Sequence, residues 1–190
     1  MTDGQDDQIA KWLADAARGD QNAWRAIVSE FSPRIFGLLR AQCRDADLAE
    51  ELTQSVFVTL AEKLAEYTEQ GQFESWIFRV AINRLRDEMR RRTRHAKPMA
   101  QETLSEIEGG AGDSGYRTVE PEQVLALERA MDELSTADRE IVDLRHTAGL
   151  SFKQIASLLE EPVGTLLARH HRALARLRET IERIQKRESK

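Results

Sequence analysis

The sequence has one cysteine, Cys43, among its 190 residues, and only four scattered histidines. A single thiol cannot form an internal disulfide or a cysteine-clustered zinc site, and this usage fits a reducing cytoplasm. The histidines show no metal-ligand spacing, so the sequence predicts neither a metal nor a cofactor. Apolar residues make up 41% of the chain, which is ordinary for a globular protein, yet no apolar run approaches membrane-spanning length.

Two further absences narrow the class of function. The first twenty residues are acidic and interrupted by charge, unlike a signal peptide, so we expect a cytoplasmic protein. The chain has no glycine-rich phosphate loop and no nucleophile with a matching base. Asp143 and His146, three residues apart on one expected helix, are interpreted as structural. The sequence therefore predicts a protein that is not an enzyme.

What the chain does have is helical periodicity over most of its length. The stretch from residue 99 to residue 121 is different, because it combines glycine, serine and acidic residues with little apolar content, as flexible linkers do. No unclaimed apolar stripe is evident, which favours a monomer. The sequence predicts an all-α fold of two helical domains joined by a flexible acidic linker, with the N-terminal domain at 1–98, the linker at 99–122 and the C-terminal domain at 123–190.

Charge is segregated along the chain, although the net charge is only −5. Residues 84–97 and 165–187 each hold seven Lys or Arg against two acids, whereas 45–66 and 99–123 each hold six acids against one base. Such alternation suits a protein that binds a polyanion with some surfaces and a basic protein partner with others.

The last third of the chain carries the pattern of a helix-turn-helix. Ser151 and Gln154 can form a capping box at the start of one helix, and Pro162 ends that helix and suits the start of the next. The second helix of such a pair enters the DNA major groove, where arginine pairs with guanine edges. An ordinary helical hairpin with a solvated basic face remains an alternative. One apolar stripe is expected on the second helix: Val163, Leu166, Leu167, His170, Leu174, Leu177, Ile181 and Ile184.

The first domain carries aromatics beside arginines within residues 73–92. Bases stack on aromatic rings while guanidinium groups follow the phosphates, so this combination is typical of single-stranded nucleic-acid binding. The alternative is that the aromatics belong to the core, and Trp76 and Val80, one turn apart, are expected to face inward.

Three strings, taken in order, resemble the extracytoplasmic-function (ECF) group of bacterial RNA polymerase sigma factors. They are DLAEELTQSVFVTLAEKL (47–64), FESWIFRVAINRLRDEMRRR (73–92) and LERAMDELSTADREIVDLRHTAGLSFKQIASLLEEPVGTLLARHHRALARLRE (127–179). The resemblance spans both domains and implies sigma regions 2 and 4. It implies that the chain directs promoter-specific transcription initiation. The implied partners are core RNA polymerase, promoter DNA in duplex and single-stranded form, and an anti-sigma factor. The implied location is the cytoplasm, on the nucleoid when the chain is bound to polymerase.

The resemblance also implies a role for individual residues. The polymerase-binding set is Glu50, Glu51, Gln54 and Phe57. The set that opens the minus-ten element and captures its single strand is Phe73, Trp76, Arg79, Asn83, Arg84, Asp87 and Arg90. The set that binds the duplex minus-thirty-five element is Thr165, Arg169, His171, Arg172 and Arg176. The acidic linker resembles the segment that threads the RNA path of the polymerase.

The chain departs from the family at three places. Ser55 stands where an acid commonly follows the glutamine, and Leu167 and Ala168 stand where polar DNA contacts are common. Glu160 and Glu161 replace a small and apolar turn and bring negative charge near the phosphates. The alternative function is a two-domain helix-turn-helix regulator that binds duplex DNA as a dimer without polymerase.

Overall fold

The structure, a computed structural model, describes residues 3–68, 71–96 and 121–188. Every regular element in these ranges is helical, which confirms the all-α prediction. The elements are α1 (Asp3–Ala17), α2 (Gln21–Cys43), α3 (Ala46–Lys63), the 3-10 turn η1 (Leu64–Glu66), α4 (Phe73–Ala96), α5 (Pro121–Asp132), α6 (Thr136–Val142), the π-helical turn η2 (Asp143–Thr147), α7 (Phe152–Leu159) and α8 (Val163–Glu188).

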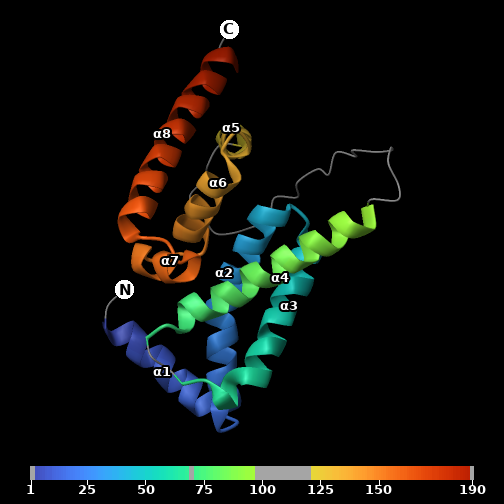
Figure 1. Ribbon diagram of the computed structural model, residues 1–190, viewed down its shortest axis with the longest axis vertical. Helices are drawn as coiled ribbons and strands as arrows, with labels where there is room; N and C mark the ends of the chain where they lie inside the picture. Colours follow the sequence, from blue (N-terminus) through green and yellow to red (C-terminus); the bar gives the residue numbers. More distant parts are fainter. Residues whose placement is uncertain (1–2, 69–70, 97–120, 189–190) are drawn as a thin grey trace.

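The first four helices pack around one apolar core. Aspartates begin two of them: Asp20 accepts a hydrogen bond from the backbone N–H of Asn22, and Asp45 accepts one from that of Leu48. Helix α4 crosses α2 and α3 diagonally (Figure 1). Its apolar side faces inward, because large buried side chains from α2, α3 and α4 meet there: Ile27, Phe31, Ile35, Leu38, Leu39, Leu60, Ile77 and Phe78.

The helix-turn-helix forms as its local signals predict. The backbone N–H of Ser151 donates to Gln154 Oε1 over 2.8 Å, and the N–H of Gln154 donates to Ser151 Oγ over 3.3 Å, so the capping box is complete. Helix α7 ends at Glu160, whose φ of 57° is left-handed, and α8 begins directly after Pro162. The turn and the start of the second helix are therefore confirmed.

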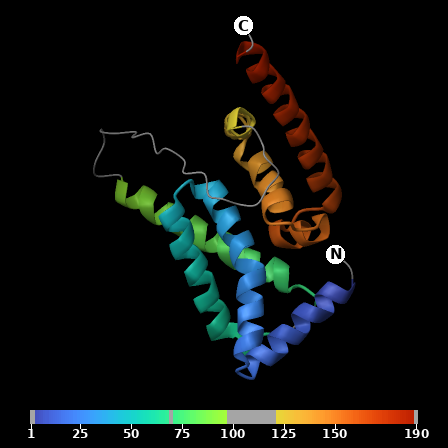
Figure 2. The ribbon, with the colours of Figure 1, turned by 180° about the vertical axis from the view of Figure 1, so that it is seen from behind.

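The expected apolar stripe of α8 is partly wrong. The buried apolar residues are Leu166, Ala173 and Leu177, whereas Leu167 and Leu174 are exposed, as is Val163. The reason lies in the neighbours of α8, because α5, α6 and α7 all cover the same side of the long helix (Figures 1 and 2). An apolar stripe that included every one of these positions would be wider than the surface that α5, α6 and α7 cover. The residues at its edges are therefore exposed to solvent.

The C-terminal helices pack directly on the N-terminal ones. Helix α7 lies on α4 and η2 lies on α2, and Figures 1 and 2 show this junction at the lower end of α8. One continuous cluster of buried side chains joins the N-terminal core to Ile141, Leu144, Leu150 and Ile155. Most of the predicted linker, 99–122, lies outside the described residues, and the boundaries at 1–98 and 123–190 remain predictions. No described helix has the length and apolarity required to span a bilayer.

Candidate functional site

The acidic face of α3 is available for binding. Glu50, Glu51 and Gln54 are exposed, and Gln54 Nε2 donates to Glu50 Oε1 over 3.3 Å. Phe57 is half-buried and packs against the core. Residues three and four positions apart share one helix face, so the four predicted polymerase-binding residues form a single surface, with carboxylates at one end and an aromatic ring at the other.

An apolar groove between α2 and α3 continues this surface. Its volume is about 510 Å³, and Gln54 and Phe57 form part of its wall. Val58 at its edge is 57% exposed. Exposed apolar grooves of this kind are typical of protein-binding sites. Sequence reasoning missed the other lining residues, which α2 and α3 bring together: Trp24, Val28, Ser32, Thr53, Val58 and Ala61.

Three aromatic rings cluster where η1 leads into α4. The ring centroids of Tyr67 and Trp76 are 5.3 Å apart, and those of Phe73 and Trp76 are 6.0 Å apart. Phe73 is buried and meets Phe31 edge-on at 5.2 Å. In this arrangement Phe73 supports the ring of Trp76 from the core side, whereas Tyr67 and Trp76 are only partly buried.

A pocket of about 230 Å³ opens beside these rings. The residues that line it provide an aromatic wall, a guanidinium group, an amide and hydroxyls, which together suit a planar polar ring. Six of them belong to the N-terminal half of the chain and one to α7: Tyr67, Thr68, Gln72, Ser75, Trp76, Arg79 and Ser157.

Farther along α4, the remaining predicted single-strand residues form a polar ridge. Asn83, Asp87 and Arg90 are exposed at spacings of four and three, and Arg90 lies 3.6 Å from Asp87. Arg84 Nη2 donates to Thr59 Oγ1 over 2.9 Å, so its side chain lies against α3. The structure thus places Trp76 and Arg79 in the wall of the pocket. The ridge of Asn83, Asp87 and Arg90 lies outside the pocket, farther along α4.

The basic end of α4 is internally paired. Glu88 accepts hydrogen bonds from Arg91 and Arg92, and these bonds lower the pKa of Glu88 to about 2. Arg92 also reaches Asp45 at 3.2 Å. These arginines therefore keep their charge in a fixed geometry at the far end of the helix.

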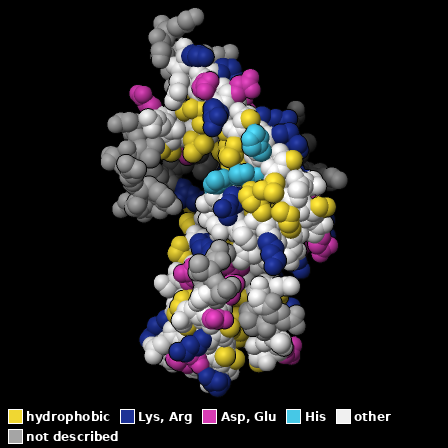
Figure 3. Space-filling model, turned by 90° about the vertical axis from the view of Figure 1, so that its left-hand side faces the viewer, with side chains coloured by type: hydrophobic (Ala, Val, Ile, Leu, Met, Phe, Trp, Pro, Cys, Tyr) yellow, Lys and Arg dark blue, Asp and Glu magenta, His cyan; other side chains and the backbone are white. Residues whose placement is uncertain are grey.

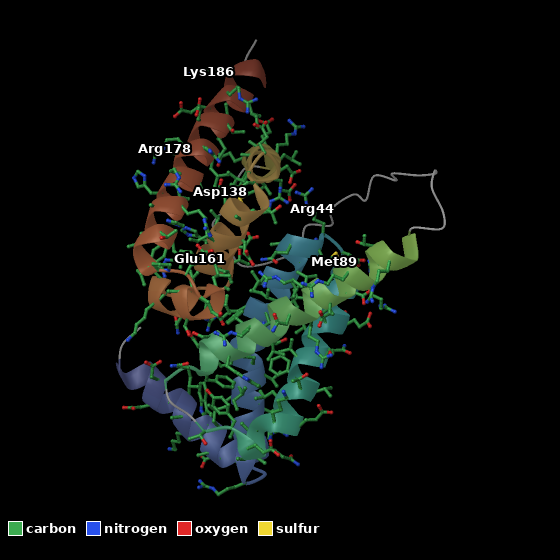
Figure 4. All side chains as sticks on the ribbon, viewed as in Figure 1. Arg44, Met89, Asp138, Glu161, Arg178 and Lys186 are labelled. Carbon is green, nitrogen blue, oxygen red and sulfur yellow. The ribbon has the colours of Figure 1, made fainter. Side chains whose placement is uncertain are left out.

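The N-terminal half of α8 presents some of its predicted duplex contacts and restrains others. Thr165, His171 and Arg172 are exposed. Arg169 donates through both terminal nitrogens to Glu161, at 3.0 and 2.7 Å, and these bonds raise the pKa of Arg169. Glu161 lies where α7 meets the base of α8 (Figure 4). Of the two glutamates in the turn, Glu161 is thus neutralised by an expected DNA contact, Arg169.

The arginines farther along α8 divide between its inner and outer sides. Arg176 Nη1 donates to Asp138 over 2.6 Å, and Figure 4 shows Asp138 on the inner side of α8 with Arg178 on the outer side. Ser135 Oγ accepts from the backbone N–H of Asp138 at 3.1 Å. Ser135 therefore caps the start of α6, and the carboxylate of Asp138 is engaged in the ion pair with Arg176.

His146 and Asp143 lie in different surroundings, because His146 is exposed and Asp143 is buried. The ring of His146 stacks on His170, with the two Nε2 atoms 2.9 Å apart, and burial lowers the pKa of His170. Histidines lie on the molecular face of Figure 3, among apolar and basic side chains. Asp143 is buried, and burial raises its pKa to about 7. Across the described ranges, no group of three or more metal-ligating side chains is suited to a metal ion.

Comparison with known proteins identifies the two halves. The model of Sigma-70 region 2 matches residues 27–95, and that of Sigma-70 region 4 matches residues 125–177. The RNA polymerase sigma-H factor of Pseudomonas aeruginosa is 28% identical, over 96% of this chain and 95% of its own length. The ECF RNA polymerase sigma factor SigE of Mycolicibacterium smegmatis is 29% identical, over 87% of this chain and 65% of its own length.

Solved structures share the fold. The sigma factor RpoE of Bartonella quintana, in complex with the anti-sigma factor NepR, superimposes with a TM-score of 0.70 and 20% identity over 84% of this chain and 96% of that one. CnrH, in complex with the cytosolic domain of CnrY, gives a TM-score of 0.66 and 21% identity over 92% and 97%. The family expected from the three sequence strings is confirmed. The chain belongs to the ECF group of RNA polymerase sigma factors, which direct transcription initiation at promoters.

Proposed function

We propose that the chain binds core RNA polymerase through the acidic face of α3 and the apolar groove beside it. Glu50 and Glu51 supply negative charge for a basic partner helix, and Phe57 and Val58 supply apolar contact area. The observation that carries this assignment is the continuity of the exposed carboxylates with a groove of about 510 Å³. Interfaces combine an apolar centre with a polar rim in the same manner.

The pocket beside Trp76 is assigned to promoter opening. A base extruded from the duplex loses a few kcal/mol of stacking and pairing, and a fitted pocket with aromatic walls offsets that loss. Trp76 and Tyr67 offer ring faces, Arg79 offers a guanidinium group, and the exposed ridge from Asn83 to Arg90 follows the strand. Phe73 contributes indirectly, because its buried ring packs against Trp76 from the core side.

The first half of α8 is assigned to the duplex minus-thirty-five element. Thr165, His171 and Arg172 are the exposed contacts, and Arg169 and Arg176 enter the interface from their ion pairs with Glu161 and Asp138. The proposed domains, 1–98 and 123–190, then correspond to the two promoter-binding units.

Regulation and location follow from the same assignment. The related structures RpoE and CnrH were solved with proteins bound to them, an anti-sigma factor in the first case. We assign this chain the same class of partner. Its place of action is the cytoplasm, on the nucleoid when polymerase is bound.

The experiment that tests the proposal is co-purification with sigma-free core polymerase of the source bacterium. Glu51→Arg combined with Gln54→Ala is expected to weaken the complex, whereas Glu62→Arg, an exposed α3 charge reversal outside the groove, controls for net charge. Unchanged co-purification of the double variant would remove the α3 assignment. Trp76→Ala is expected to impair promoter opening more than polymerase binding.

A further inference from the structure

The side of α8 that points away from the other helices is mostly apolar over its first turns. Leu167 and Ala168 are exposed three and four residues after Gly164, which is exposed as well. His171 follows them by four and three residues and is also exposed. Residues at these spacings share one face of a helix. This outer face of α8 therefore offers a single hydrogen-bonding side chain, the imidazole of His171.

Leu167 is the largest apolar side chain of the outer face, and 46% of it is exposed. One turn before it, a Cβ added at Gly164 would meet no described atom within 4 Å. Glycine weakens a helix relative to alanine, and the backbone of Gly164 is helical, so neither packing nor a turn requires glycine there. Glycine also permits another molecule to approach closely. Its lack of a side chain leaves room for a ligand beside Leu167.

Basic groups lie next to the outer face. Arg172 is exposed directly after His171, and Arg178 lies on the outer side of α8 farther along (Figure 4). Figure 3, which views the side of the molecule where α8 lies, shows apolar and histidine side chains among basic ones. A major groove offers the complementary arrangement, because its base edges lie between two rows of phosphates. The charge therefore selects duplex DNA as the occupant of this face.

Two arginines of α8 that could read guanine are engaged elsewhere. Arg169 donates through both terminal nitrogens to Glu161, at 3.0 and 2.7 Å. Arg176 donates to Asp138 over 2.6 Å. Arginine reads guanine by two parallel hydrogen bonds, which Arg169 cannot make while both terminal nitrogens hold Glu161. The residues best placed to distinguish bases are then those of the outer face.

Thymine is the base that presents a methyl group in the major groove, and apolar side chains contact it there. Covering this methyl removes apolar surface of both partners from water, which stabilises the contact. The polar edges of guanine and cytosine would instead lose hydrogen bonds to water without gaining a partner. An apolar outer face thus favours thymine.

We propose that Leu167, with Ala168 beside it, reads thymine methyl groups, so that thymine specifies the part of the upstream promoter element that these side chains cover. The inference rests on the proposed binding of α8 to the minus-thirty-five element. It adds the chemistry by which that site selects its sequence.

The test begins with the upstream element itself. Duplexes randomised over the minus-thirty-five region are selected by this chain bound to core polymerase. Each thymine of the enriched element is then replaced by deoxyuridine, which pairs identically and lacks only the methyl group. Replacement of the thymine that contacts Leu167 should weaken binding about fourfold, the effect of burying one carbon group.

Variants of this chain assign the methyl contact to its side chain. Leu167→Ala should bind the thymine and deoxyuridine duplexes about equally at that position. Leu174→Ala, two turns farther along α8 at a leucine that is 37% exposed, is the matched control and should keep the fourfold difference. Leu167→Arg should change the base enriched at that position from thymine to guanine.

The outcomes separate this inference from the proposed function. An enriched element without thymine, or one that binds equally well with deoxyuridine, would overturn the inference and leave the assignment of α8 to upstream DNA intact. Weaker polymerase binding by Leu167→Ala, with its methyl dependence unchanged, would place Leu167 in a protein contact and overturn the inference as well. If no upstream element is enriched, the assignment of α8 fails and the inference with it.

Discussion

Asp143 provides a quantitative prediction about stability. Its side chain lies in the C-terminal helices with 2% exposure, its Oδ2 has no hydrogen-bond partner among the described residues, and burial raises its pKa from 3.8 to about 7. Between these two pH values the folded chain holds a proton that the unfolded chain has released. The free energy of unfolding therefore falls as pH rises, by about 4 kcal/mol across the whole interval.

Asp143→Asn removes this titration while keeping the shape of the side chain. The free energy of unfolding of Asp143→Asn, relative to that of the parent, should increase by about 3 kcal/mol from pH 5 to pH 8. About two pH units of that range lie below the raised pKa of Asp143, and only the parent loses stability across them. Urea unfolding followed by helical circular dichroism at four pH values measures the difference. Asp87→Asn, at an exposed position, controls for the loss of a carboxylate. Parallel pH profiles for the parent and Asp143→Asn would refute the reasoning.

Three further predictions concern binding. Val58→Glu, which places a charge at the edge of the apolar groove, should weaken polymerase binding about tenfold; a titration with core polymerase that shows no change contradicts the groove assignment. Arg172→Ala should lower the slope of log Kd against log salt for duplex binding by about 1, and an unchanged slope means no phosphate contact. Glu161→Gln releases Arg169 from its ion pair and should tighten duplex binding with a steeper salt dependence in fluorescence anisotropy; weaker binding would indicate that Glu161 positions Arg169.

Features with local signals were predictable from the sequence. The capping box at Ser151 and Gln154 and the helix start after Pro162 depend on residues within four positions of each other, so their physical chemistry is readable along the chain. The basic face of α8 and the acidic face of α3 follow from helical periodicity in the same way. These features also carried the family resemblance.

Features that depend on packing were not predictable. Periodicity assigns every apolar residue of a helix to the core, so it placed Leu167 and Leu174 inside and gave no sign that Val58 edges an open groove. The partner of Glu161 lies eight residues onward across a turn, and the partner of Glu74 lies eighty residues away. No local pattern relates such pairs, because only the packed helices bring them together.

The two uses of Gln154 limit how this position can vary during evolution. Its carbonyl oxygen caps α7, and its amide nitrogen donates to buried Glu74. A residue without a terminal carbonyl loses the cap, and an acid meets the carboxylate of Glu74. Relatives that keep this contact between α4 and α7 should therefore change positions 74 and 154 together.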